Sequence, residues 1–163
     1  MNLRYSLAKI IIASIGFSIF LLACGGKSDA TPPQNQNTST TIKLDRTDAI
    51  GGIDSNNTGI RDDIKSLIAL APPENRKSLE RVAKAYQNAL IKNNNIDEAV
   101  QVQNEIEKSV ICLSKNFVDY EAASNTLLAA TANTENRFMA LVKFESTMSS
   151  ANLQDFPVAD CNQ

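Results

Sequence analysis

The fold is decided by residues 72–95, which read PPENRKSLERVAKAYQNALIKNNN. Between the two prolines and the three asparagines, apolar side chains recur at spacings of three and four residues: Leu79, Val82, Ala83, Tyr86 and Leu90. This spacing places them along one face of an α-helix, which turns once in about 3.6 residues. Proline pairs and asparagine runs are typical of the ends of helices. The stretch therefore predicts an amphipathic helix whose apolar face packs against other helices.

The periodicity continues on the C-terminal side of this stretch. Asn95 is typical of a helix N-cap, and the residues after it repeat at the same spacing. The predicted inner face of this helix carries Ile96, Ala99, Gln103, Ile106, Val110, Leu113 and Phe117. The alanine-rich residues 122–132 leave open whether this helix continues or a separate one follows.

Two further helices complete the pattern. A last helix is predicted after a cap at Asn133-Thr134, and its predicted inner face carries Phe138, Leu141, Val142 and Met148. A short first helix is predicted from Asp62 to Leu70. No segment alternates as a strand does, and the turn at 95–99 has no second copy, as a repeat solenoid would require. We therefore expect an all-α fold, a small bundle of four to five helices.

The N-terminal residues combine an apolar run at 10–22 with a small residue directly before a cysteine. The sequence Leu21-Leu22-Ala23-Cys24 resembles the lipobox of bacterial lipoproteins. The resemblance implies a signal peptide at 1–23, cleavage before Cys24, and lipid on that sulfur. The alternatives are plain secretion and an uncleaved transmembrane helix, for which the run is shorter than the roughly 20 residues needed.

The residues after this cysteine indicate where the domain lies. Gly25 rather than Asp follows Cys24, and by the sorting rule of the lipoprotein family this implies the outer membrane of a Gram-negative bacterium. Residues 25–41 contain no large apolar side chain, so they cannot bury enough surface to offset the entropy of ordering. We therefore expect a flexible tether at 24–41 and the helical domain at 42–163.

Two cysteines remain once lipid is assigned to Cys24. Cys112 and Cys161 would lie in an oxidising compartment, where a pair of cysteines usually bonds. A disulfide between them would clip the C-terminal tail onto the helix that carries Cys112. Two buried thiols are the alternative.

Composition excludes several classes of function. Removal of residues 1–23 takes away Arg4 and Lys9, which leaves 14 of the 16 basic side chains against 18 acidic ones, a net charge of −4. Nucleic acid is therefore not an expected partner, because its binding needs clustered Lys and Arg. The chain has no histidine, which excludes Ser-His-Asp and Cys-His nucleophile pairs. We expect no enzyme; a hydrolase that uses Ser-Lys or paired carboxylates is the less favoured alternative.

Residues 54–63, DSNNTGIRDD, are a candidate ligand loop. Asp54, Asn56 and Thr58 place side-chain oxygens at loop positions 1, 3 and 5, and Gly59 stands at position 6. Calcium loops use this spacing because alternating side chains wrap a hard cation and glycine permits the sharp turn.

The loop resembles the shortened calcium loops written Asp-x-Asp-x-Asp-Gly-x-x-x-acid. That resemblance implies that Ile60 supplies its carbonyl and that Asp62 and Asp63 close the shell around a structural calcium. Lys65 stands where a full EF-hand has an acid, so a standard EF-hand is not expected. A loop without metal, in which turns lead into a helix whose N-terminus favours acids, remains the alternative.

This loop, together with Asn133–Arg137 at the start of the last helix, is similar to a set of small uncharacterised proteobacterial envelope lipoproteins, which imply no activity. We therefore predict a membrane-anchored envelope lipoprotein with a non-enzymatic binding or structural role. Its expected partners are the membrane and an envelope protein or surface polymer. An inhibitor or immunity-type lipoprotein that binds a periplasmic or secreted enzyme is the alternative. Val100 and Val102 are a candidate docking face unless they face another helix.

Overall fold

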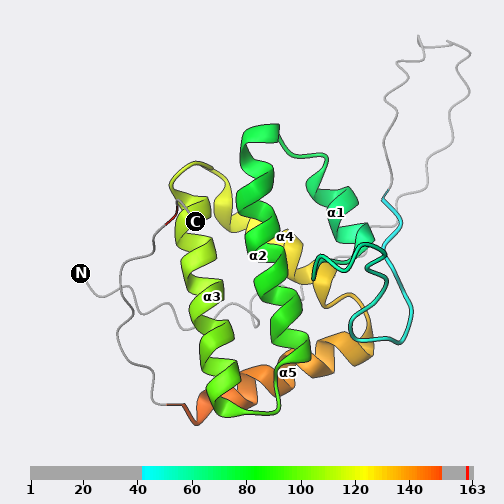
Figure 1. Cartoon of the computed structure of the whole chain (residues 1–163), viewed down its shortest axis with the longest axis vertical. Helices are drawn as coiled ribbons and strands as arrows, with labels where there is room; N and C mark the ends of the chain where they lie inside the picture. The colour runs from blue at the N-terminus through cyan, green and yellow to red at the C-terminus, as the bar shows by residue number, and fades with distance from the viewer. Residues whose placement is uncertain (1–41, 152–160, 162–163) are drawn as a thin grey trace, which may run out of the picture. The chain divides into compact units, whose positions relative to one another are not determined.

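The computed structural model describes residues 42–151 and Cys161, and these form a five-helix arrangement (Figure 1). The helices are α1 (Asp62–Ile68), α2 (Pro73–Ile91), α3 (Ile96–Ser114), α4 (Tyr120–Thr131) and α5 (Glu135–Ser149). No strand occurs in the described ranges, so the all-α prediction is confirmed. The predicted signal peptide, Cys24 and the tether lie outside the described residues. None of the described helices is long and apolar enough to cross a membrane.

Helix α2 is the central element, because it packs against each of the other four helices. The predicted stripe from Leu79 to Leu90 is buried throughout. Ala85 and Ala89 are buried as well, on one flank of α2 beside the stripe. A helix surrounded by neighbours buries more than one face, and alanine allows those neighbours to approach closely. The central position of α2 therefore explains why its buried surface is wider than the predicted stripe.

Helix α3 runs antiparallel beside α2 after a short turn (Figure 1). The Asn95 cap is confirmed, since its side-chain oxygen accepts the Asp97 N–H at 2.8 Å. Ile96 was predicted inward, but it is exposed because it begins the helix beyond the end of the core. Val102 is buried and Val100 packs against the core, so the docking face suggested for these valines faces other helices instead.

The chain turns between α3 and α4, so residues 122–132 belong to a separate helix and do not continue α3. The N–H groups of Asn116 and Phe117 both bond to the carbonyl of Leu113, at 3.2 and 3.1 Å. Phe117 then packs against the core, which directs the chain back across the bundle.

The inner face of α5 differs from the predicted one. Phe138 and Val142 are 47% and 42% exposed, whereas Phe144 and Met148 are buried together with Arg137. Successive helical residues are about 100° apart, so the buried three share one side and the exposed two lie about 100–140° round the helix from it. The prediction of Phe138 and Val142 as core residues is therefore wrong. Apolar side chains on both sides of α5 gave two possible inner faces.

The disulfide prediction is confirmed. Cys112 and Cys161 are bonded, with Sγ atoms 2.10 Å apart, and link positions separated by 49 residues. Arg81 of α2 donates to the carbonyl of Cys161 at 3.1 Å. Closing a loop of this size restricts the unfolded chain and contributes about 4 kcal/mol in the chain-entropy treatment. Cys161 is thereby held at the C-terminal end of α3.

Candidate functional site

The loop before α1 is organised by its own hydrogen bonds. The carboxylate of Asp54 accepts the Gly59 N–H at 2.7 Å and the Thr58 hydroxyl at 3.1 Å. Asn57 and Gly59 have positive φ angles of 52° and 82°, which asparagine and glycine tolerate in tight turns. These contacts close the loop from its first predicted ligand to its glycine.

An ammonium group lies where the calcium hypothesis places a cation. Lys65 Nζ is 2.8 Å from Asp54 Oδ1 and 2.8 Å from Asp62 Oδ1. Its hydrogen bonds are the main cause of the lowered pKa of both carboxyls, and they raise the pKa of Lys65 itself. Asp62 also accepts the hydroxyl of Ser55 at 2.6 Å. The two acids are therefore satisfied by groups of this chain.

Of the remaining predicted ligands, Thr58 contacts the Asp54 carboxylate, whereas Asn56, Ile60 and Asp63 do not join the two carboxylates. Asp63 turns to Arg61, with Oδ2 to Nη2 at 2.7 Å. Asn56 is exposed, and the Ile60 carbonyl accepts the Thr58 hydroxyl at 3.3 Å. Across residues 42–151 and Cys161, no group of three or more His, Cys, Asp or Glu side chains is placed to hold a metal ion. This arrangement fits an internal ammonium, and calcium binding stays a prediction.

Sequence reasoning missed the two buried arginines beside this loop. Arg61 is fully buried and donates to the carbonyls of Thr131 at 2.8 Å and Ala130 at 3.1 Å. These carbonyls belong to the last turn of α4, where the helix dipole favours a cation. The Arg61–Asp63 pair therefore fixes the start of α1 to the end of α4.

The second buried arginine fastens the segment that precedes the loop. Arg137 donates to the Asp45 carbonyl at 2.7 Å and to the Ala49 carbonyl at 2.9 Å. Its Nη2 also lies 3.3 Å from the Asp45 carboxylate. Gly52 (φ 61°) passes so closely that a Cβ there would lie 2.3 Å from the Cδ of Arg61. We call residues 45–53 with these two arginines the arginine clamp.

The charge of Asp45 is held by the same clamp. Its carboxylate accepts the N–H groups of Thr47 at 2.8 Å and Ile53 at 3.0 Å. Burial acts to raise the pKa of Asp45, but these hydrogen bonds and the charge of Arg137 outweigh it and lower the pKa to about 2. The only sequence signal for Arg137 was its place seven and eleven residues before Phe144 and Met148, on the same helical face.

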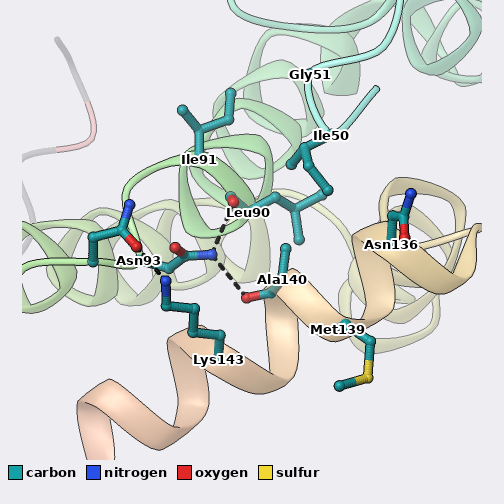
Figure 2. Close-up of a pocket in the computed structure, with 10 residues that line it drawn as sticks. Ile50, Gly51, Leu90, Ile91, Asn93, Asn136, Met139, Ala140 and Lys143 are labelled. Atoms are coloured by element: carbon teal, nitrogen blue, oxygen red, sulfur yellow. Dashed lines mark hydrogen bonds between the residues drawn. The ribbon is translucent and has the colours of Figure 1, made fainter. Parts of the chain in front are cut away.

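A groove of about 610 Å³ lies at the C-terminal end of α2 (Figure 2). Three segments build it: the loop at 50–51, the end of α2 with the turn after it, and the first turns of α5 (Figure 2). The residues that line it are Ile50, Gly51, Leu90, Ile91, Asn93, Asn94, Asn136, Met139, Ala140 and Lys143. No local pattern in the sequence indicates this groove, because its walls are far apart along the chain.

Hydrogen bonds fix the walls of the groove. The Asn93 amide donates to the carbonyls of Leu90 and Ala140, each at 3.0 Å, and so joins α2 to α5 (Figure 2). On the other side, Arg137 holds the Ala49 carbonyl directly before Ile50. The groove is therefore supported by buried contacts on both sides.

The surface of the groove is mostly apolar with polar points. Ile91 and Met139 are 51% and 56% exposed. Lys143 is the one charged side chain that lines the groove (Figure 2), and its ammonium donates to the Asn94 side chain. No carboxylate of the described part of the chain forms an ion pair with Lys143. The arrangement can bind apolar side chains beside an acidic or polar group.

A smaller hollow of about 340 Å³ lies between the loop and α2. Its lining mixes the cations Lys65, Lys77, Arg81 and Lys84 with Glu80. Because Lys65 is already paired with two aspartates, this hollow offers less uncompensated charge than its lysines suggest.

Protein-family models, curated proteins and solved structures were each compared with this chain, and none of them matches it.

Proposed function

We propose that the chain is a membrane-anchored lipoprotein of the cell envelope whose helical domain binds another protein without catalysing a reaction. The sequence Leu21-Leu22-Ala23-Cys24 supports the anchor, and the polar residues 25–41 support a tether long enough to let the domain reach a partner. The outer membrane is the proposed location because Gly25 follows the cysteine.

The observation that carries the binding role is the exposed apolar surface at the groove. Ile91 and Met139 present apolar side chains to solvent beside a depression of about 610 Å³. Clustered exposed apolar residues that a polar rim surrounds are typical of protein-binding surfaces.

The arrangement of acids and hydroxyls supports a non-enzymatic role. Asp62 is bonded to Lys65 and Asp63 to Arg61, so the adjacent carboxylates act as separate ion pairs. Ser124, in the core, shares a 2.6 Å hydrogen bond with Tyr86. A catalytic acid–base pair would instead share one cleft.

The anchor is tested in a Gram-negative host that expresses the full chain. Metabolic labelling with a fatty-acid analogue should label the wild-type protein, and Cys24→Ser should abolish the label. Mass spectrometry of the mature protein should give an N-terminus at Cys24. A label that persists in Cys24→Ser, or a mature protein that retains residues 1–23, would overturn the anchor.

The binding role is tested in the same cells by incorporating a photoreactive amino acid at chosen positions of the protein. At position 139 it should give a discrete crosslinked protein, whereas at exposed Lys108 on α3 it should give none. Equal crosslinking at both positions would contradict a binding surface at the groove.

A further inference from the structure

The exposed apolar surface extends from the groove over the outer side of α5. Phe138, Met139 and Val142 are all more than 40% exposed. With about 100° between successive residues, the three lie within an arc of about 100° on α5. Met139 stands at one edge of this arc and also lines the groove. We call the groove and these α5 side chains the α5 face.

Charge in the groove itself has one sign, whereas exposed Glu135 lies on the outer side of α5, one turn before Phe138 and Met139. Lys143 contributes a positive charge to the groove, and within the described part of the chain its ammonium donates to the neutral side chain of Asn94. An ammonium next to apolar surface gains most from a carboxylate that arrives with the ligand, because the dielectric falls when water is displaced. Charge complementarity therefore favours an acidic occupant.

Carboxamides at the rim match a polypeptide. Asn93, Asn94 and Asn136 line the groove, and each carboxamide carries both a donor and an acceptor. The Asn93 donor is used by Leu90 and Ala140, which leaves its oxygen as an acceptor for a backbone N–H. Such groups satisfy the alternating N–H and C=O of a peptide chain better than they satisfy a lipid.

Resting on the proposed binding function, we infer that the α5 face binds a segment of a partner protein that carries apolar side chains next to an Asp or Glu. The carboxylate pairs with Lys143, and the apolar side chains pack on Ile91 and Met139. Apolar burial supplies most of the affinity and the ion pair selects the sequence.

Two other occupants are less well matched to this surface. The tether at 25–41 has no large apolar side chain to place on Met139. A second copy that docks through the same face would bring two Lys143 ammonium groups toward each other across the two-fold axis, because symmetric contacts pair a patch with itself. Both arguments favour a different chain as the partner.

The test uses the full-length protein in detergent micelles and a display library of random twelve-residue peptides. Selection on the wild-type protein should enrich peptides that combine Asp or Glu with Leu, Ile, Phe or Met. The best of these, made synthetically, should bind Met139→Ser about tenfold more weakly. The matched control Lys108→Glu, at an exposed position of α3, should bind it unchanged.

Charge reversal gives the decisive comparison. Selection on Lys143→Glu should shift the enriched residues from acidic to basic, while the apolar residues stay. Identical peptides from both proteins, or no enrichment from either, would overturn the inference.

A membrane contact is a third outcome, and it would also overturn the inference. It would protect Met139 from peroxide oxidation in phosphatidylglycerol vesicles but not in phosphatidylcholine vesicles. The outcomes separate this inference from the proposed function. If the bound peptides showed no acidic preference, the inferred chemistry of the partner would be wrong and the binding role would stand. If Cys24 carried no lipid, the anchor alone would be wrong.

Discussion

The arginine clamp with its neighbouring loop differs from the α5 face in how far the charged groups are paired within the chain. At the clamp, Asp45, Asp54, Asp62 and Asp63 each meet a cation or several N–H donors of this chain. At the α5 face, apolar side chains are exposed, and among the described residues the Lys143 ammonium contacts the amide side chain of Asn94 and no carboxylate. A region that satisfies its own groups contributes to stability, and one that leaves them unsatisfied is available for binding. The loop at 54–63, the most conspicuous motif in the sequence, is thus a region that satisfies its own charged groups.

The largest effect is expected from Arg137→Met. Removing this buried guanidinium takes one donor from each of the carbonyls of Asp45 and Ala49, which keep the Asn133 amide and the Gly52 N–H, and it leaves the Asp45 carboxylate without its cation. Removing one partner of a buried ion pair lowers the free energy of unfolding by about 3–5 kcal/mol. Urea unfolding should show this loss, and the exposed control Lys115→Met should stay close to wild type. A loss below about 1 kcal/mol would contradict a stabilising clamp.

A loss of about 2–4 kcal/mol is expected from Cys161→Ser. The change opens the loop that Cys112–Cys161 closes and so gives entropy to the unfolded chain. Wild type in reducing buffer should unfold at the same urea concentration as the variant. If the reduced wild type were much more stable than Cys161→Ser, the loss would come from the serine and not from the bond.

Acid should destabilise the wild-type protein by about 1–2 kcal/mol more than the variant Asp45→Asn. The pKa of Asp45 is lowered to about 2 in the folded protein, so its contribution is present above the unfolded pKa near 4 and is lost as pH falls toward 2. The unfolding free energy of wild type should therefore fall more between pH 5 and pH 2 than that of Asp45→Asn. Parallel curves for the two proteins would contradict the role of this carboxylate.

A shift of a few °C in melting temperature should distinguish an internal ammonium from calcium. Lys65→Gln removes the cation between Asp54 and Asp62, so calcium should raise its melting temperature relative to chelator. Wild type should melt identically in both. A calcium-dependent rise in wild type that Asp54→Ala abolishes would instead support the calcium loop.

The smallest effect on stability is expected from Met139→Ser. The side chain is 56% exposed, so thermal unfolding should change by less than about 0.5 kcal/mol. Together with lost peptide binding, this result would place binding and stability in different regions. A large destabilisation would show that Met139 belongs to the core.

The sequence predicted the parts of this fold that depend on local spacing. The α2 stripe from Leu79 to Leu90, the Asn95 cap and the disulfide follow from periodicity, capping chemistry and the count of cysteines. It could not choose the inner face of α5, where Arg137 rather than Phe138 is buried. That choice depends on carbonyls at Asp45 and Ala49, which are about 90 residues away in the chain.

The candidate sites divide in the same way. A loop of consecutive residues, such as 54–63, presents its pattern in the sequence, but which groups its acids contact depends on Lys65 and Arg61. The groove has no such pattern, because Ile50, Ile91 and Met139 meet only in the folded chain. Sequence reasoning therefore found the loop that the chain's own ion pairs close, and it missed the groove that we propose as the binding surface.

The arginine clamp also determines how the domain responds to mechanical load. Residue 42 begins the described chain, and the first firmly bonded residue after it is Asp45, held by Arg137 and by the Asn133 amide at 2.8 Å. A pull from the N-terminal side therefore acts first on the hydrogen bonds at the corner between α4 and α5. Several bonds at this corner share the force, so the core helices keep their packing until the clamp itself yields.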